Sequence, residues 1–411
     1  MSKLPVKRVH RTIEADSIHL ALAMWMEMFP DDTEEQCSTA NGREQSTTAG
    51  TGTPATTQLF RKVGCVLVEG DGRLLAIDRS RDGAHGLASL LVKHHDRAKD
   101  CSVFISRKPC TYCSKLSLKA GVRKVSYPPV EPEYYEARKE EKRIEALFDA
   151  AQIVQNVFFP QLKKELVTAV EEELSAKATS FNYVREFVEK VSNRFWNDEY
   201  AKGVIEGPFH QAKHDLENLS KWFAQIYLPL KHSKFALAAK HIAIPSERAT
   251  SAFDPENDLH QRRIANHLLA LGRMTVQYTV EPKTGVGCVI MKDNDIVAIG
   301  WNDFPLKSIE ESFHYATDQE RDGKYPFFIH AEQNALLARN AKDVTGTVIF
   351  VTKIPCHECT PLVKVAGIGT VVLSTPLKPV QEKYSLNYET FREEVERGTF
   401  ICYETSTENV S

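Results

Sequence analysis

The chain has 411 residues, a formal net charge of −3 and 42% hydrophobic residues, which together predict a globular protein of two or three domains. This balance argues against a disordered chain and against a strongly basic one. No apolar run approaches the roughly 18 residues of a membrane span, and residues 1–11 lack the apolar core of a secretory signal. Nine cysteines, four of them in C-x-x-C pairs, indicate metal binding in a reducing compartment. We therefore expect a cytoplasmic or nuclear protein that does not bind membranes.

The first part of the chain predicts a helix, a loop and a hairpin. Residues 12–29 (TIEADSIHLALAMWMEMF) are typical of an amphipathic helix. Residues 31–58 are rich in Thr, Ser, Gly and Gln and have almost nothing to bury, which predicts a disordered loop. Residues 62–68 and 73–77 are apolar runs on either side of a Gly/Asp turn, as in a β-hairpin.

The middle of the chain predicts helices. Residues 131–255 are rich in Glu, Lys, Ala and Leu at helical spacing. Aromatic side chains such as Trp196, Trp222 and Phe223 need burial, which a linker would not provide. We therefore expect a helical insertion that packs on one or both flanking domains. A further helix is predicted at 258–274 and another within 381–402.

The most informative stretch is 327–362. It contains His330, then Glu332 two residues later, and then P-C-H-E-C with Cys356 and Cys359. This H-x-E…P-C-x-x-C pattern is typical of zinc-dependent nucleobase deaminases. One imidazole and two thiolates would supply three ligands and leave the fourth tetrahedral position of Zn²⁺ open. The Glu is not a ligand in this pattern, and we predict that it carries protons from the attacking water to the ring and to the departing amine.

The flanking sequence places this motif at two helix starts. The run ALLARN after Glu332 predicts a helix, and GTVIFVT at 346–352 predicts a buried strand. Pro355 suits the first turn of a second helix, where a missing N–H costs nothing. Backbone N–H groups near Ala331 and Cys356 are candidates to hold the ring edge of a substrate.

The chain also repeats itself. The sequence VGCV at 63–66 recurs at 286–289, and VFISRKPCTYC at 103–113 matches IFVTKIPCHEC at 349–359. A third block follows each of these, LSLKAGVRKV in the first half and LVKVAGIGTV in the second. Three matched blocks in the same order predict two copies of one domain.

Alignment of the copies gives the first one a candidate zinc triad of its own, His85, Cys110 and Cys113. However, Leu87 stands where the second copy has its Glu. Loss of general acid–base catalysis alone costs about 10²–10⁴-fold in rate. We therefore predict an inactive first copy with a structural zinc. The predicted domains are an inactive deaminase domain at 10–130, the helical insertion at 131–255, and a catalytic domain with a C-terminal helix at 256–411.

The sequence GWNDFP at 300–305, together with H-A-E and P-C-H-E-C, resembles the dCMP-deaminase branch of the cytidine deaminase superfamily. The longer insertion that precedes H-A-E in that branch is present here at 306–329. The resemblance implies two α/β/α domains, each with a five-stranded mixed sheet flanked by helices, joined here by the helical insertion. It also implies that Asn302 contacts the sugar or base. Finally, it implies oligomers of six domains, which three chains would supply, and regulation by an effector nucleotide such as dCTP.

Several of these residues have a simpler interpretation. Asn302 could only stabilise its own turn. Lys307 and Lys353, with Lys283 and His314, are candidate phosphate contacts but could be ordinary solvated side chains. The zinc site of the second copy could be a closed structural one, although such a site needs a fourth protein ligand.

The leading prediction is a zinc-dependent enzyme that deaminates a free deoxycytidine nucleotide to the deoxyuridine nucleotide and ammonia. We favour dCTP over dCMP because a second, inactive nucleotide-type domain could hold or sense a triphosphate. One alternative is a polynucleotide cytosine deaminase, but single-strand binding requires a positively charged groove with stacking aromatics, and the near-neutral charge argues against nucleic acid as a partner. The other alternative is a non-catalytic zinc scaffold, against which the intact Glu332 argues.

Overall fold

The structure is a computed structural model, and it describes residues 13–30, 60–81, 83–134, 137–176, 181–204, 209–239, 253–279, 285–305, 328–377 and 386–406. The predicted disordered loop at 31–58 lies outside the described residues. Within these ranges, none of the helices is long and apolar enough to cross a membrane.

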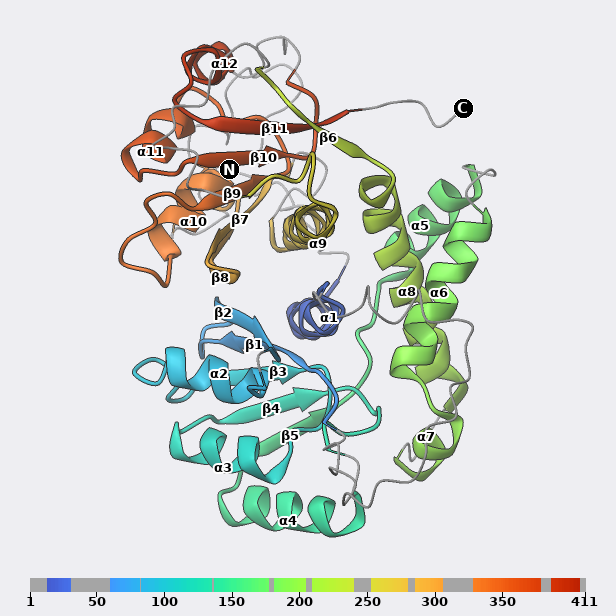
Figure 1. The fold of residues 1–411 in the computed structure, drawn as a ribbon. Helices are drawn as coiled ribbons and strands as arrows, with labels where there is room; N and C mark the ends of the chain where they lie inside the picture. Colours follow the sequence, from blue (N-terminus) through green and yellow to red (C-terminus); the bar gives the residue numbers. More distant parts are fainter. Residues whose placement is uncertain are drawn as a thin grey trace, which may run out of the picture.

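A five-stranded mixed sheet forms the centre of the first half of the molecule (Figure 1). Its strands follow the order β2-β1-β3-β4-β5. Strand β1 runs antiparallel to β2 and β3, whereas β3, β4 and β5 are parallel. The strands are β1 (Gly64–Val68), β2 (Leu74–Arg79), β3 (Ser102–Ile105), β4 (Lys124–Tyr127) and β5 (Val154–Val157). The hairpin predicted from 62–77 is thus confirmed as β1 and β2.

The second sheet has the order β8-β7-β9-β10-β11 and then a sixth strand, β6. Strand β7 is antiparallel to β8 and β9, and β9, β10 and β11 are parallel, as in the first sheet. Strand β6 adds antiparallel to β11 at the far edge. The strands are β7 (Gly287–Lys292), β8 (Asp295–Trp301), β9 (Val348–Val351), β10 (Thr370–Leu373), β11 (Ile401–Ser406) and β6 (Lys234–Leu237).

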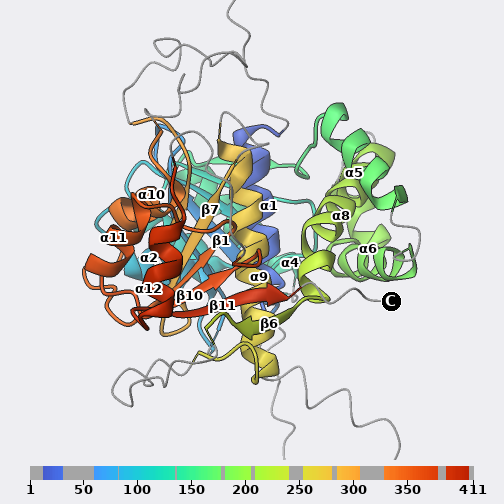
Figure 2. The same cartoon turned by 90° about the horizontal axis from the view of Figure 1, so that it is seen from above.

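Helices α1 (Ala15–Glu27) and α9 (Leu259–Thr275) lie side by side against one face of the two sheets (Figure 2). Asp258 caps α9 by accepting a hydrogen bond from the backbone N–H of Gln261 at 3.0 Å. Both helices were predicted. However, α1 does not have the solvent-facing side expected of an amphipathic helix, because every residue from Ser17 to Glu27 is buried. It packs on β1, on α9 and on the helices of the insertion, so no face is left for solvent.

The glycine of the repeated VGCV block has a packing reason in both halves. A Cβ atom on Gly64 would collide with the backbone oxygen of Ala23 in α1, and one on Gly287 would collide with that of Gly272 in α9. Each strand therefore begins where a helix backbone presses directly against it. A side chain at either position would force the helix away from the sheet.

Further helices cover the opposite faces of the sheets and complete two α/β/α layers, which confirms the predicted fold class. They are α2 (Gly86–Lys93), α3 (Thr111–Lys119) and α4 (Ala137–Ala150) on the first sheet, and α10 (Ala331–Ala338), α11 (Cys359–Val365) and the predicted C-terminal helix α12 (Glu389–Glu396) on the second. Short 3₁₀ helix η3 (Val276–Tyr278) continues α9.

The insertion also supplies four further helices, α5 (Lys164–Ala176), α6 (Phe181–Phe195), α7 (Asp198–Val204) and α8 (Phe209–Lys231). Helix α8 packs on α9, and α5 and α6 pack on α8, on the right in Figure 2. Trp222 and Phe223 are buried there, as predicted. The structure differs from the predicted helical insertion 131–255 at both ends, because β5 completes the first sheet and β6 joins the second. Their sequences, VQNV and KFAL, show neither strict alternation nor a continuous apolar run, so no pattern identifies them as strands.

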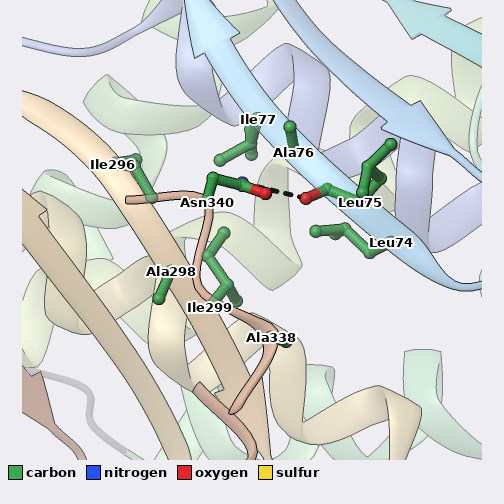
Figure 3. Close-up of a pocket in the computed structure, with 9 residues that line it drawn as sticks. All are labelled: Leu74, Leu75, Ala76, Ile77, Ile296, Ala298, Ile299, Ala338 and Asn340. Atoms are coloured by element: carbon green, nitrogen blue, oxygen red, sulfur yellow. Dashed lines mark hydrogen bonds between the residues drawn. The ribbon is translucent and has the colours of Figure 1, made fainter. Parts of the chain in front are cut away.

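The two sheets meet at their edge strands β2 and β8, where apolar side chains line a small pocket (Figure 3). Asn340, in the segment after α10, crosses this junction and donates a hydrogen bond from Nδ2 to the backbone oxygen of Leu75 at 3.0 Å. Lys93 of α2 bridges Asp78 and Asp295 at 2.9 and 2.8 Å. The two halves are therefore joined by apolar packing and by polar contacts.

Candidate active site and metal centres

The predicted ligands of the second half come together. His330 stands immediately before α10, Cys359 begins α11 and Cys356 lies in the preceding segment. The His330 Nδ1 atom is 3.3 Å from the sulfur atoms of both cysteines. Ligand atoms on a tetrahedral zinc are separated by about 3.5 Å when Zn–N is about 2.0 Å and Zn–S about 2.3 Å. The three side chains therefore fit a zinc ion with little adjustment.

Helix α10 holds His330 in place. The Gln333 side chain accepts a hydrogen bond from the His330 backbone N–H at 3.0 Å, which completes a capping box. Asn334 in the same helix donates from Nδ2 to the backbone oxygen of Trp301 at 2.9 Å, which ties α10 to the end of β8. The imidazole is thus fixed by the start of a helix that is itself fastened to the sheet.

Glu332 lies in the first turn of α10, beside the ligand cluster but not part of it. It is 4% exposed, and this burial raises the pKa of its carboxyl to about 7. A carboxyl with a pKa near neutrality can take up and release a proton with little cost at physiological pH. The position and environment therefore suit a proton carrier.

The side chains of Cys356 and Cys359 are hydrogen-bonded to each other, and this bond shifts the pKa of each thiol in an opposite direction. The hydrogen bond from the Cys359 thiol, followed by the interaction with His330, lowers the pKa of Cys356 to about 4. The same hydrogen bond and burial raise the pKa of Cys359. A thiolate is the form that binds a metal, so one ligand is already prepared for it.

The segment before α12 also reaches the cluster, which the sequence did not indicate. Asn387 accepts a hydrogen bond from the backbone N–H of His357 at 2.7 Å, and its own N–H donates to His357 Nδ1 at 3.1 Å. Burial and the neighbouring charges of Cys356 and Glu332 raise the pKa of Tyr388. No motif marks these residues, because they are about thirty positions away from their partners.

The remaining predicted contacts are placed as follows. Asn302 is 9% exposed, accepts a hydrogen bond from Val286 N–H at 2.6 Å and donates to Thr279 Oγ1 at 3.3 Å, so its amide holds its own turn. Ala331 is buried as the first residue of α10, and Lys353 is exposed. Lys307, Lys283 and His314 lie outside the described residues. Substrate contact by these residues stays a prediction.

The ligands predicted in the first half also converge, and a fourth residue joins them. His85 precedes α2 and Cys110 precedes α3, and with Cys113 and Glu133 they bring their ligand atoms within 4.8 Å of one another. His85 Nδ1 is 3.4 Å from Cys110 Sγ and 2.7 Å from Glu133 Oε1. These two hydrogen bonds raise the pKa of His85 to about 10. Sequence reasoning missed Glu133 because it follows β4 without any motif.

Leu87 is the counterpart of Glu332 in the first half. Each is the second residue of the helix that follows the ligating histidine, and Leu87 is completely buried in the core beneath α2. The first cluster therefore has no carboxylate at the place where the second has Glu332.

Comparison with known proteins agrees with this chemistry. The family model for the cytidine and deoxycytidylate deaminase zinc-binding region matches residues 264–375. The chain is 32% identical to deoxycytidylate deaminase of Mus musculus over 127 residues, which cover 30% of the chain and 68% of that protein. The human deoxycytidylate deaminase is 34% identical over 109 residues, 26% of the chain and 61% of that enzyme. The chain belongs to the cytidine and deoxycytidylate deaminase family, a family of zinc-binding deaminases.

One relative matches along nearly the whole chain. It is the cytidine and dCMP deaminase domain-containing protein 1 of Danio rerio, 25% identical over an alignment of 421 residues that covers 90% of the chain and 85% of that protein. Among solved structures, the dCMP deaminase of cyanophage S-TIM5 in its apo form is 22% identical with a TM-score of 0.26. That match covers 34% of the chain and 95% of the phage protein.

Proposed function

We propose that the chain catalyses the hydrolytic deamination of a free deoxycytidine nucleotide, giving the deoxyuridine nucleotide and ammonia. The observation that carries this is the buried carboxylate of Glu332 beside a three-residue ligand cluster, His330, Cys356 and Cys359. The relatives named deoxycytidylate deaminase support a cytosine nucleotide as substrate. We favour dCTP, with dCMP as the alternative, because the inactive first copy could hold or sense a triphosphate.

The three ligands and Glu332 have separate roles in this mechanism. Zinc held by His330, Cys356 and Cys359 would supply Lewis-acid activation of a water molecule. Glu332 accepts a proton from the attacking water and delivers it to N3 of the cytosine ring. After the water oxygen bonds to C4, Glu332 moves the remaining proton of that water to the amine, the bond between C4 and the amine nitrogen breaks, and ammonia leaves. Burial of the carboxyl keeps bulk water from competing for these protons.

We also propose that the first copy is non-catalytic. Leu87 supplies no proton carrier, and Glu133 sits among the ligands of that cluster. The common strand order and directions of the two sheets support two copies of one domain. The limits 10–130, 131–255 and 256–411 remain predictions, with β5 and β6 placed in the sheets as described above. The junction at β2 and β8 supports a first copy that takes the place of a partner subunit.

Assembly into three or more chains, with an effector nucleotide, is part of this proposal. A mass measurement of the zinc-loaded protein with and without dCTP tests it. A single-chain mass in both conditions would exclude the ring of six domains.

The decisive experiment offers the zinc-loaded protein dCTP, dCDP, dCMP, CTP, deoxycytidine and a cytosine-containing DNA strand, and measures ammonia and product. Glu332→Gln is the inactive variant, and Glu396→Gln, an exposed change on α12, is the matched control. Turnover of one free nucleotide that Glu332→Gln abolishes would establish substrate and catalytic residue together. Turnover of the DNA strand and of none of the free compounds would point to a polynucleotide deaminase. If zinc is bound and none of these compounds is turned over, the result would favour a non-catalytic zinc scaffold.

A further inference from the structure

We propose that Glu133 is the fourth ligand of a closed zinc site in the first copy. With His85, Cys110 and Cys113 it would complete the tetrahedron, so that no coordination position is left for water or substrate. The site would then hold its metal for structure alone. This inference concerns a different cluster from the proposed active site and does not depend on the substrate assigned there.

The geometry of Glu133 is that of a ligand. Its side chain is 1% exposed, and Oε1 lies 2.7 Å from His85 Nδ1. The other carboxylate oxygen, Oε2, accepts a hydrogen bond from the backbone N–H of Cys110 at 3.0 Å, which orients the group. Ligands on a zinc ion are about 3.3 Å apart when the metal–ligand distances are near 2.0 Å. A shift of less than about 1 Å would therefore admit the ion.

The backbone holds Glu133 from both sides. Its N–H donates to the Lys108 oxygen at 3.1 Å, and its own oxygen accepts from Arg61 N–H at 2.8 Å. Lys108 belongs to the segment that leads to Cys110, so the carboxylate and the first thiol are fixed to the same piece of chain. A site of this kind is preorganised, because Cys110 and Cys113 follow Lys108 in the chain and Glu133 is hydrogen-bonded to Lys108.

The charges within the cluster favour a metal. A buried carboxylate is costly unless it is paired or coordinated. The carboxylate of Glu133 has His85 as its ion-pair partner, and the two cysteines of the same cluster are also buried. A divalent cation would offset two of the three negative charges of the carboxylate and the two thiolates, and His85 would bind it as the neutral imidazole.

Aromatic rings cover the outer side of this cluster. The ring of Phe60 lies 4.6 Å from that of His85, edge to face, and is stacked on Tyr134 at 4.8 Å. Phe60 and Tyr134 are also joined by an antiparallel bridge, and the ring of Tyr112 lies 5.4 Å from His85. These contacts place two rings next to the histidine, and the third, Tyr134, is stacked on Phe60.

The second cluster differs from the first in the number of residues that could bind a metal. In the part of the chain that the structure describes, His330, Cys356 and Cys359 form a group without a fourth histidine, cysteine or carboxylate at ligand distance. Glu332 is close by but outside this group. The contrast between four ligands and three is the observation that the proposal explains.

The test uses the full chain with Cys356→Ser and Cys359→Ser, which removes the thiolates of the second cluster. Loaded with Co²⁺, this parent should bind one metal per chain and show the intense visible bands of tetrahedral cobalt with two thiolates. Added azide should leave the spectrum unchanged, because no position is open. With Glu133→Gln in the same background, azide should alter the spectrum, and a chelator should remove the metal at least about tenfold faster.

Glu131→Gln is the matched control, because Glu131 lies two residues before Glu133, pairs with Arg61 and is not in the cluster. It should behave like the parent. A folded parent that retains no cobalt, or one whose spectrum responds to azide, would overturn the proposal. A Glu133→Gln protein that is well folded and releases metal at the parental rate would do so as well.

The wild-type chain provides a measurement that needs no variant at Glu133. Chelator should remove zinc from it in two phases of equal amplitude, a fast one from the three-ligand site and a slow one from the closed site. A single fast phase that releases both ions would overturn the proposal.

Discussion

The two halves of this chain hold their candidate metal sites on the same scaffold but surround them differently. In each, a histidine precedes a helix and two cysteines lie at the start of another, below sheets with the same order and directions for five strands. The second half places Glu332 beside its three ligands, whereas the first places Leu87 there and brings Glu133 into the cluster. The comparison teaches that one His/Cys/Cys pattern can be built with or without a buried carboxylate two residues after the histidine.

The two halves also share part of their surroundings. Helices α1 and α9 share one hydrophobic core with the inner face of both sheets and with the helices of the insertion. The first half therefore contributes packing to the second. The following predictions test how far the two copies differ, beginning with the largest expected effect.

Exchanging Glu332 and Leu87, which occupy the same position in the two halves, should largely abolish turnover in the second half without creating it in the first. Glu332→Leu should lower kcat by about 10²–10⁴-fold because the proton carrier is lost. Leu87→Glu, made in the Glu332→Leu background, should not restore turnover. It should also destabilise the fold, because it buries a carboxylate in an apolar core. Ammonia release and zinc content measure the outcome. Recovery of turnover in the double variant would show that the first site is open after all.

A buried ion-pair network distinguishes the end of α1 from the end of α9. Glu27 is buried with Arg107 at 2.8 Å and Arg194 at 3.0 Å, and it accepts a hydrogen bond from Ser106 at 2.6 Å. Glu27→Gln should reduce the free energy of unfolding in urea by about 3–5 kcal/mol, because two arginines lose their buried partner.

The control for this change is Glu189→Gln, which removes an exposed pair with Arg185 and should cost less than about 1 kcal/mol. Equal losses from the two substitutions would mean that burial adds nothing to the Glu27 network. That result would remove one of the differences between the copies.

The contact between α1 and α9 should make the protein sensitive to acid. His267 of α9 is buried and stacked on Trp25 of α1 at 4.4 Å, and burial, with a smaller effect of Arg79, lowers its pKa well below the usual value. The unfolded chain takes up a proton near pH 6.5, whereas the folded chain does not until much lower pH. Stability should therefore fall as pH drops below about 6.5, with about 2 kcal/mol lost from His267 between pH 7 and pH 5.

His267→Phe keeps a ring at this position and removes the titrating group. The difference in unfolding free energy between wild type and this variant, measured in urea at several pH values, isolates the contribution of His267. A difference that does not change between pH 7 and pH 5 would contradict the prediction.

The smallest effect is expected at the junction of the two sheets. Asp295 pairs with Lys93 at 2.8 Å and with Arg81, and these side chains are partly exposed. Asp295→Asn should cost less than about 1 kcal/mol in low salt and less still at 1 M salt, since screening weakens exposed ion pairs. A loss of several kcal/mol would show that polar contacts, and not apolar packing, hold the halves together.

The sequence by itself determined the local chemistry. His330, Glu332, Cys356 and Cys359 could be read directly, because ligands two or three residues apart must share a helix start wherever the helix lies. The repeated blocks predicted that His85, Cys110 and Cys113 would converge, and the structure brings them together. The predicted helices at the start of each half and the hairpin of β1 and β2 were confirmed for the same reason, since hydrophobic period is a local signal.

Tertiary structure decided what depends on distant parts of the chain. Glu133 meets His85 across 48 residues, and no spacing rule connects them. Helix α1 is buried on all sides because α9 and the insertion pack against it. The segments of β5 and β6 adopt strand conformation because each pairs with the edge strand of a sheet, β5 with β4 and β6 with β11. Each of these outcomes follows from the partner that a segment meets after folding, and the sequence of the segment does not contain that partner.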